Sequence, residues 1–238
     1  MKFGKIICSV LLLTAAMPAF AGEAEKKAAE IIGTNLATLL SPESIEVTVA
    51  DNGKNAWIEC IGADLSGVRI DSMKLNADLV SLPKDDSENA EELSKYITSS
   101  RGEIRLLESD VNNYFASGKS SGNFSDLKFD FKPAGYYASG KFSANLVFIN
   151  VDLDLEANGK LGLHPDGVYL EKTEITTQGM KQPDNIVSLV TNSVNPLLSF
   201  EKIPFPVTFK RLEMKDKEVM LTGEPKKLSG GNTWRQKR

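Results

Sequence analysis

The segment 146–156 places an apolar residue at every second position from Val147 to Leu155, and from Asn150 on the intervening positions are polar or acidic. Because successive side chains of a β-strand point to opposite faces of its sheet, this alternation predicts a strand with one dry face and one wet face. The dry face must be covered by the chain's own helices or by a ligand. The residues predicted on it are Val147, Ile149, Val151, Leu153 and Leu155.

The region 122–178 repeats this strand signature several times. Its predicted strands are 124–131, 136–144, 146–156, 160–163 and 168–177. Asn158-Gly159 and Pro165-Asp166-Gly167 lie between them, and such sequences favour the backbone conformations of tight turns. We therefore expect an antiparallel meander here. Further strands are predicted at 45–50, 56–61, 68–82, 103–107, 207–214 and 218–222.

Two segments repeat apolar residues at the three- and four-residue spacing of amphipathic helices. The first is 24–40, and the second, 184–200, follows Pro183. The segment 226–238 is basic and poor in apolar residues, which predicts a disordered tail. The sequence thus predicts an α+β fold: a long, curved antiparallel β-sheet wrapped on one or two long helices, in a single elongated domain over residues 22–225.

Residues 1–21 have the pattern of a secretory signal peptide. Lys2 and Lys5 precede the apolar run 6–16, and Ala19-Phe20-Ala21 provides a small-x-small cleavage sequence. We expect cleavage after Ala21, so that the mature chain begins at Gly22. An uncleaved membrane anchor is the alternative, but the run is shorter than the roughly 20 residues that a membrane span needs. The mature protein is predicted to be exported and soluble, in the periplasm or cell envelope.

The charge balance argues against a nucleic-acid partner. The formal net charge of −4 becomes −6 when the predicted signal peptide, with two lysines and no acids, is removed. Phosphate backbones require a basic surface, which this composition does not provide.

No catalytic or metal-binding pattern is present in the sequence. It contains a single histidine, His164, and the mature chain retains one cysteine, Cys60, which is expected to be a buried core residue. Asp152, Asp154 and Glu156 share one strand face, but their regular alternation favours a solvated face over an acid–base pair. We expect neither catalytic residues, nor metal ligands, nor a cofactor, although acid–base catalysis by a carboxylate pair stays formally open.

A bent sheet with few helices can leave an apolar groove, and an acyl chain in such a groove gains roughly 0.8 kcal/mol for each buried methylene. We expect the second helix to face the concave sheet across this groove, with its stripe Ile186, Leu189, Val190 and Leu197 opposite Leu75, Leu79, Phe129 and Leu153. The residues predicted to line it are Leu36, Leu39, Leu75, Leu79, Phe129, Val151, Leu153, Ile186, Leu189, Val190 and Leu197.

Four sequence stretches resemble the LmeA-like phospholipid-binding family, long catalogued as a domain of unknown function. They are 61–68 (IGADLSGV), 107–114 (LESDVNNY), 194–198 (VNPLL) and 203–207 (IPFPV). The resemblance covers roughly residues 24–224. It implies a tubular lipid-binding (TULIP-like) architecture with a curved sheet around a long helix, a lipid-accepting groove and an envelope location. It supplies no catalytic residues.

Two functions are compatible with this sequence. The first is an exported, non-catalytic lipid-binding or lipid-transfer protein, with phospholipid or another lipid as ligand and transient contact with a membrane surface. The alternative is a structural or protein-interaction module of the envelope with a self-filled core; its protein partners are not identified by the sequence. Full packing of Leu36, Leu39, Ile186, Leu189 and Val190 would favour the module, whereas a cavity lined by them would favour lipid binding.

Overall fold

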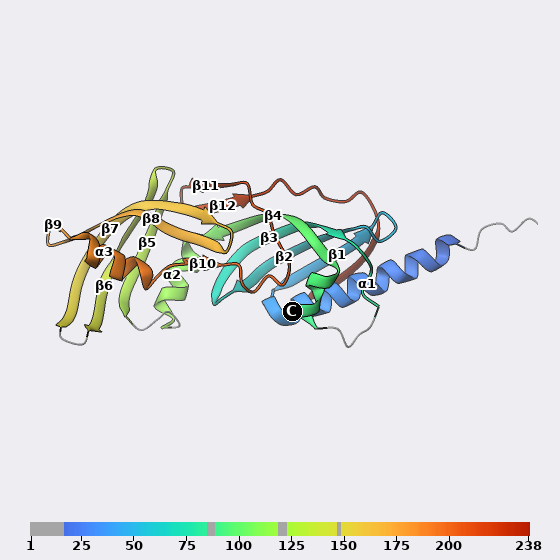
Figure 1. The fold of residues 1–238 in the computed structure, drawn as a ribbon, viewed down its shortest axis with the longest axis horizontal. Helices are drawn as coiled ribbons and strands as arrows, with labels where there is room; N and C mark the ends of the chain where they lie inside the picture. The colour runs from blue at the N-terminus through green and yellow to red at the C-terminus, as the bar shows by residue number, and fades with distance from the viewer. Residues whose placement is uncertain (1–16, 85–88, 119–122, 147–148) are drawn as a thin grey trace, which may run out of the picture.

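The protein has an α+β fold with two antiparallel sheets of seven and six strands, arranged one after the other along the molecule's long axis (Figure 1). The computed structural model describes residues 17–84, 89–118, 123–146 and 149–238. The predicted α+β class with antiparallel strands and few helices is confirmed. The β-structure is divided between two sheets, and one of the helices contacts both of them.

The seven-stranded sheet has the order β11-β12-β4-β3-β2-β1-β13. Its strands are β1 (Ser44–Ala50), β2 (Asn55–Leu65), β3 (Val68–Leu79), β4 (Ile97–Leu107), β11 (Arg211–Lys215), β12 (Glu218–Thr222) and β13 (Asn232–Lys237). A 3₁₀ helix, η1 (Ala90–Lys95), lies in the connection between β3 and β4. Neighbouring strands of this sheet pair antiparallel. The strands β1 to β4 are neighbours in the order in which they occur in the chain.

Helix α1 (Met17–Leu40) packs against β1, β2 and β13 of this sheet. It begins before the predicted start at Ala24, so the predicted cleavage position after Ala21 falls within it. Its apolar side chains reach a closed core, in which the helix and strand residues are fully buried. These residues are Ile32, Leu36, Leu40, Ile58, Met73 and Leu75.

The six-stranded sheet contains the predicted meander. Its order is β10-β8-β7-β6-β5, with β9 paired to β8. Its strands are β5 (Phe124–Lys132), β6 (Gly135–Leu146), β7 (Ile149–His164), β8 (Gly167–Thr177), β9 (Met180–Lys181) and β10 (Leu198–Ser199). Two short helices lie against it: α2 (Glu108–Ala116) contacts β5, and α3 (Asp184–Asn192) contacts β8.

The alternation in β7 has the predicted faces. Asp152, Asp154 and Glu156 are exposed, Leu155 is buried, and Val151 and Leu153 are half-buried. The side chains of Val147 and Ile149 lie outside the part of the chain that the structure describes. The predicted turn at Asn158-Gly159 is wrong, because β7 continues through it with a shift of register against β8. A Cβ at Gly159 would come within 2.8 Å of the carbonyl oxygen of Glu171, so this glycine permits close strand packing.

The second predicted helix, 184–200, extends beyond the helix that the structure shows. Helix α3 ends at Asn192, and the following residues turn back to pair with β8 as β10. Pro196 has no N–H to continue a helical hydrogen-bond ladder, and the amide of Asn195 bonds to the backbone of β8 instead. The apolar spacing at Leu197 and Leu198 therefore reflects burial beside the sheet.

The prediction of a disordered tail over 226–238 is wrong, because residues 232–237 form β13. This strand pairs with β1 from Ser44↔Lys237 to Val49↔Asn232. The Asn232 amide donates to Glu25 of α1 at 2.8 Å, and the indole of Trp234 lies against that helix. Composition does not predict this strand, because the strand is stabilised mainly by backbone pairing with the open edge of β1. Trp234 is its one large apolar side chain.

Among the described residues, no helix is long and apolar enough to cross a membrane.

Candidate functional site

The two halves of the molecule differ in how completely their apolar side chains are covered. Under α1, the core of the seven-stranded sheet is closed, with Leu36 and Leu75 fully buried. In the six-stranded half, many apolar side chains that touch the core keep partial contact with solvent. They are Tyr114, Phe124, Ala144, Val151, Leu153, Leu163, Ile186, Val187, Leu189 and Val194. The candidate site is therefore the incompletely covered apolar face of the six-stranded sheet.

Helix α2 is fixed to one edge of this sheet by side chains that bond to the strand backbone. The amide of Asn112 donates to the carbonyl of Phe129 at 2.9 Å and accepts from its N–H at 2.7 Å. The carboxylate of Glu108 accepts from the N–H of Phe131 at 2.7 Å. Because β5 is the last strand of its sheet, these contacts satisfy backbone groups that would otherwise be unpaired.

The segment after α3 is fixed to β8 in the same way. The amide of Asn195 accepts from the N–H of Leu170 at 2.7 Å and donates to its carbonyl at 3.2 Å. The N–H of Leu197 then bonds to the carbonyl of Val168 at 2.8 Å. Asn112 thus fixes α2 to β5, and Asn195 fixes the segment after α3 to β8. These two segments form the apolar walls of the site, and β6 and β7 lie between β5 and β8.

Aromatic rings connect the α2 wall with the sheet. Phe115 of α2 lies 5.5 Å from Phe129 and 6.3 Å from Phe124, measured between ring centroids. Phe124 in turn lies 5.0 Å from Phe142 of β6. These contacts join α2 to the sheet through a cluster of rings, in which Phe124 is half-buried and the other three are buried.

A pocket of about 190 Å³ lies where the two sheets meet. Its apolar lining comes from the β2–β3 hairpin, from α2 and from the segment after α3. The residues are Leu65, Val68, Tyr114, Phe115, Val194 and Leu197. The pocket is smaller than the roughly 300–1,000 Å³ of typical small-molecule sites. A long ligand would therefore extend from it along the half-buried side chains of the sheet.

The residues predicted to line a groove divide between the two halves. Leu36, Leu39, Leu75 and Leu79 belong to α1 and the seven-stranded sheet, where Leu39 alone is half-buried. The others belong to the six-stranded half: Phe129, Val190 and Leu197 are buried, and Val151, Leu153, Ile186 and Leu189 are half-buried. The expectation that the α3 stripe faces Leu75 and Leu79 is wrong, because α3 packs on β8 and these two leucines lie on β3.

The sequence reasoning did not select Tyr114, Phe115 and Val194 as lining residues. The first two follow the motif Ser109-Asp110-Val111-Asn112, and Val194 precedes Asn195-Pro196. Both motifs lie in stretches that resemble the family, and the asparagine of each fixes its segment to a strand. In the sequence, the positions of Asn112 and Asn195 are the signal that could have indicated these neighbouring lining residues.

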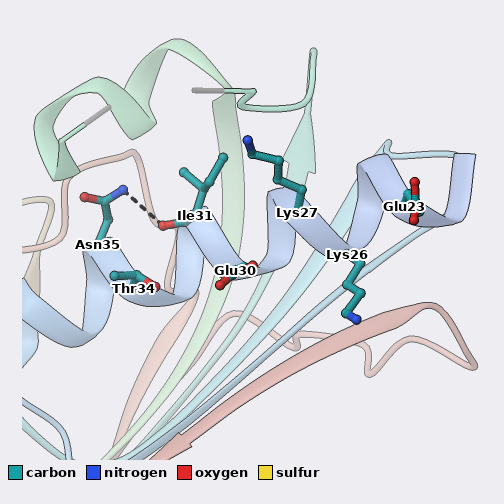
Figure 2. Close-up of a pocket in the computed structure, with 7 residues that line it drawn as sticks. All are labelled: Glu23, Lys26, Lys27, Glu30, Ile31, Thr34 and Asn35. Atoms are coloured by element: carbon teal, nitrogen blue, oxygen red, sulfur yellow. Dashed lines mark hydrogen bonds between the residues drawn. The ribbon is translucent and has the colours of Figure 1, made fainter. Parts of the chain in front are cut away.

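A larger depression of about 650 Å³ lies along the outer surface of α1 (Figure 2). Figure 2 shows its lining side chains spread along the helix, with Asn35 bonded to the carbonyl of Ile31. Glu23, Lys26, Lys27 and Glu30 make most of this lining charged. Acyl chains require an apolar wall, so this depression is a poor candidate for holding them despite its size.

The described residues contain no group of three histidine, cysteine, aspartate or glutamate side chains placed to hold a metal ion. His164 is the last residue of β7, and its imidazole bonds to the carboxylate of Glu171 at 2.8 Å. Cys60 is fully buried, and burial raises the pKa of its thiol to about 12. The thiol is thus neither deprotonated nor accessible at neutral pH.

A family model described as LmeA-like phospholipid-binding matches residues 23–224. The match begins in α1 and ends just after β12, so it includes both sheets apart from β13. No curated protein and no solved structure matches the chain.

Proposed function

This chain belongs to the LmeA-like phospholipid-binding family, and we propose that it is an exported, non-catalytic lipid-binding or lipid-transfer protein of the cell envelope. The proposed acyl-chain site is the apolar face of the six-stranded sheet between α2 and α3. Phospholipid is the ligand class that the family supports. Transfer between membranes, transient contact with a membrane surface and the envelope location are parts of the proposal.

One observation carries the proposed location of the site. Half-buried apolar side chains concentrate on α3 and β7, whereas the core beneath α1 is closed. Each methylene that leaves water for such a surface contributes roughly 0.8 kcal/mol, so a sixteen-carbon chain gains roughly 13 kcal/mol in full contact. The pocket beside Tyr114 and Leu197 would hold only part of this chain. Because α3 is short and contacts β8, we infer that it moves outward to admit the rest.

The alternative is a structural or protein-interaction module of the envelope. The closed core of the seven-stranded sheet favours it, since Leu36 and Leu75 leave no space for a ligand there. This alternative requires the six-stranded half to be closed by a protein partner. The two proposals therefore differ in what covers Ile186, Leu189 and Leu153: lipid in the first, protein in the second.

Native mass spectrometry of the protein purified from cells without detergent distinguishes them. The lipid-binding proposal predicts a population heavier than the polypeptide by the mass of a phospholipid, and organic extraction should remove that mass. The stripped protein should then take up phospholipid from vesicles. A polypeptide mass alone, both after purification and after incubation with vesicles, would contradict the proposal.

Export is tested separately by N-terminal sequencing. Cleavage after Ala21 predicts that protein recovered from the periplasmic or culture fraction begins at Gly22. An intact Met1, recovered only with membranes, would instead indicate an uncleaved anchor.

A further inference from the structure

A second pocket, of about 590 Å³, lies between the end of β7 and the segment that leads into β11. It meets the proposed acyl-chain surface at Leu163, and the rest of its lining comes from the β7–β8 turn region and from residues 207–212. Leu163 lines it near one end of β7, whereas Val151 lies near the other. At about 3.3 Å per residue, these two positions are up to roughly 40 Å apart. An acyl chain held at the Val151 end of the surface would therefore not reach this pocket.

Part of the wall of this pocket is apolar and incompletely covered. Leu163, Val207, Phe209 and Leu212 all line it, and all four are half-buried side chains in contact with the core. The ring of Phe209 is held by Phe200, with centroids 5.0 Å apart, and by Gly102, where a Cβ would come within 2.6 Å of the ring. The apolar wall is thus fixed in place, and its volume is within the usual range for small ligands.

The rim of the pocket carries positive charge. Lys210 and Arg211 are adjacent in the chain and both line the pocket, and its lining includes no aspartate or glutamate. An ammonium and a guanidinium that line one pocket suit a phosphate or carboxylate, and the guanidinium can bind either anion through two parallel hydrogen bonds.

Both cations have acidic partners outside the pocket lining. Lys210 lies 2.7 Å from Glu224, and Arg211 lies 3.0 Å from Glu213. The side chains of both pairs are about half exposed to solvent, and such pairs contribute little to stability. An anion at the pocket can therefore replace these carboxylates at small cost, especially if its apolar part fills the space next to Phe209.

We propose that this pocket binds a single-chain anionic amphiphile, with its phosphate or carboxylate at Lys210 and Arg211 and the first part of its tail against Leu163, Val207, Phe209 and Leu212. This site goes beyond the proposed function, because its cations and its wall at Val207, Phe209 and Leu212 are not part of the surface beneath α3, which it meets at Leu163. It would allow the protein to respond to lysophospholipids or fatty acids independently of the phospholipid it holds.

Isothermal titration with myristoyl lysophosphatidic acid, below its micelle concentration, tests the site. The titrations use the Leu189→Trp variant, so that binding beneath α3 contributes little. The test variant is Lys210→Gln/Arg211→Gln, which replaces both cations by neutral, unbranched polar side chains. The matched control is Lys215→Gln/Lys217→Gln, which removes two cations from the same β11–β12 hairpin outside the pocket lining.

The test variant should weaken binding roughly tenfold or more, since hydrogen bonds to charged groups are lost, and the control should change it less than about twofold. Myristoyl lysophosphatidylcholine should bind the parent protein more weakly than the acid does, and inorganic phosphate should bind far more weakly. Unchanged binding by the test variant, equal loss in the control, or equal affinity for the two lysolipids would overturn the proposal. If inorganic phosphate bound as tightly as the lysolipid, the apolar side chains would contribute nothing to binding, which would also contradict the proposal. None of these results bears on whether phospholipid co-purifies with the protein.

Discussion

The side-chain amide of Asn112 and the backbone of Phe129 exchange two hydrogen bonds, at 2.9 and 2.7 Å, which join α2 to the edge strand β5. Asn112→Ala would leave both backbone groups of Phe129 without these partners. We predict a loss of about 2 kcal/mol in the free energy of unfolding, measured by urea denaturation. Asn113→Ala is the control, because Asn113 is exposed on the same helix, and it should change stability by less than about 0.5 kcal/mol. Equal effects of the two substitutions would contradict the role given to Asn112.

Gly33 of α1 lies beneath the indole of Trp234, so that a Cβ at position 33 would come within 2.1 Å of the ring. Replacing glycine by alanine inside a helix normally stabilises it by up to about 1 kcal/mol. Here we predict the opposite sign, a loss of about 1–3 kcal/mol in thermal or urea denaturation, because the methyl group displaces β13. At Gly22 of the same helix the nearest atom would be 3.8 Å away, so Gly22→Ala should not destabilise. A more stable Gly33→Ala protein would show that β13 does not pack on α1.

The buried thiol of Cys60 gives a prediction about reactivity and pH. Because burial raises its pKa to about 12, the folded protein should not react with Ellman's reagent at pH 8, and denaturant should make one thiol of the chain beginning at Gly22 available. Above the ordinary pKa of 9.0, the thiol of the unfolded chain releases its proton, whereas that of the folded chain retains it. Rising pH therefore favours the unfolded chain. Stability should therefore fall as pH rises through 9, and Cys60→Ala should weaken that dependence. Rapid labelling of the native protein would contradict this burial.

The two faces of β7 should respond differently to substitution. Leu155 is buried and Glu156 is exposed, although they are neighbours in one strand. Leu155→Ala should cost about 2–5 kcal/mol through the cavity it leaves, and Glu156→Ala less than about 0.5 kcal/mol. Urea denaturation curves of the two variants provide the comparison. Similar midpoints would mean that the dry and wet faces are wrongly assigned.

The strand faces and the meander could be predicted because period-two alternation is a local property of the chain. Asp152, Asp154 and Glu156 are exposed as their spacing predicts. The errors occur where a contact distant in the sequence decides the structure. Asn158-Gly159 is typical of a turn, but the approach of Glu171 and Tyr136 places it inside β7. The tail became β13 because of a free edge on β1, which composition alone does not reveal.

The candidate site was predicted only in part for the same reason. Periodicity correctly indicated that Ile186, Leu189 and Val151 have an apolar environment, but it contains no information on which sheet each helix covers. The division into two sheets separates Leu36 and Leu75 from α3. Asn112 and Asn195, which position the two walls of the candidate site, have no periodicity to reveal them. Their role depends on backbone groups of Phe129 and Leu170 that are far away in the sequence.

The phospholipid content of a Leu189→Trp variant tests the central claim most directly. Leu189 is half-buried on α3, so an indole there should occupy the space that acyl chains need while the fold is retained. Ser188→Trp adds the same ring at an exposed position of the same helix and serves as control. Lipid extraction followed by mass spectrometry should show less bound phospholipid in Leu189→Trp than in the control, with nearly unchanged melting temperatures. Unchanged phospholipid together with a large fall in melting temperature, as overpacking by about 1–3 kcal/mol would produce, would contradict a lipid site beneath α3.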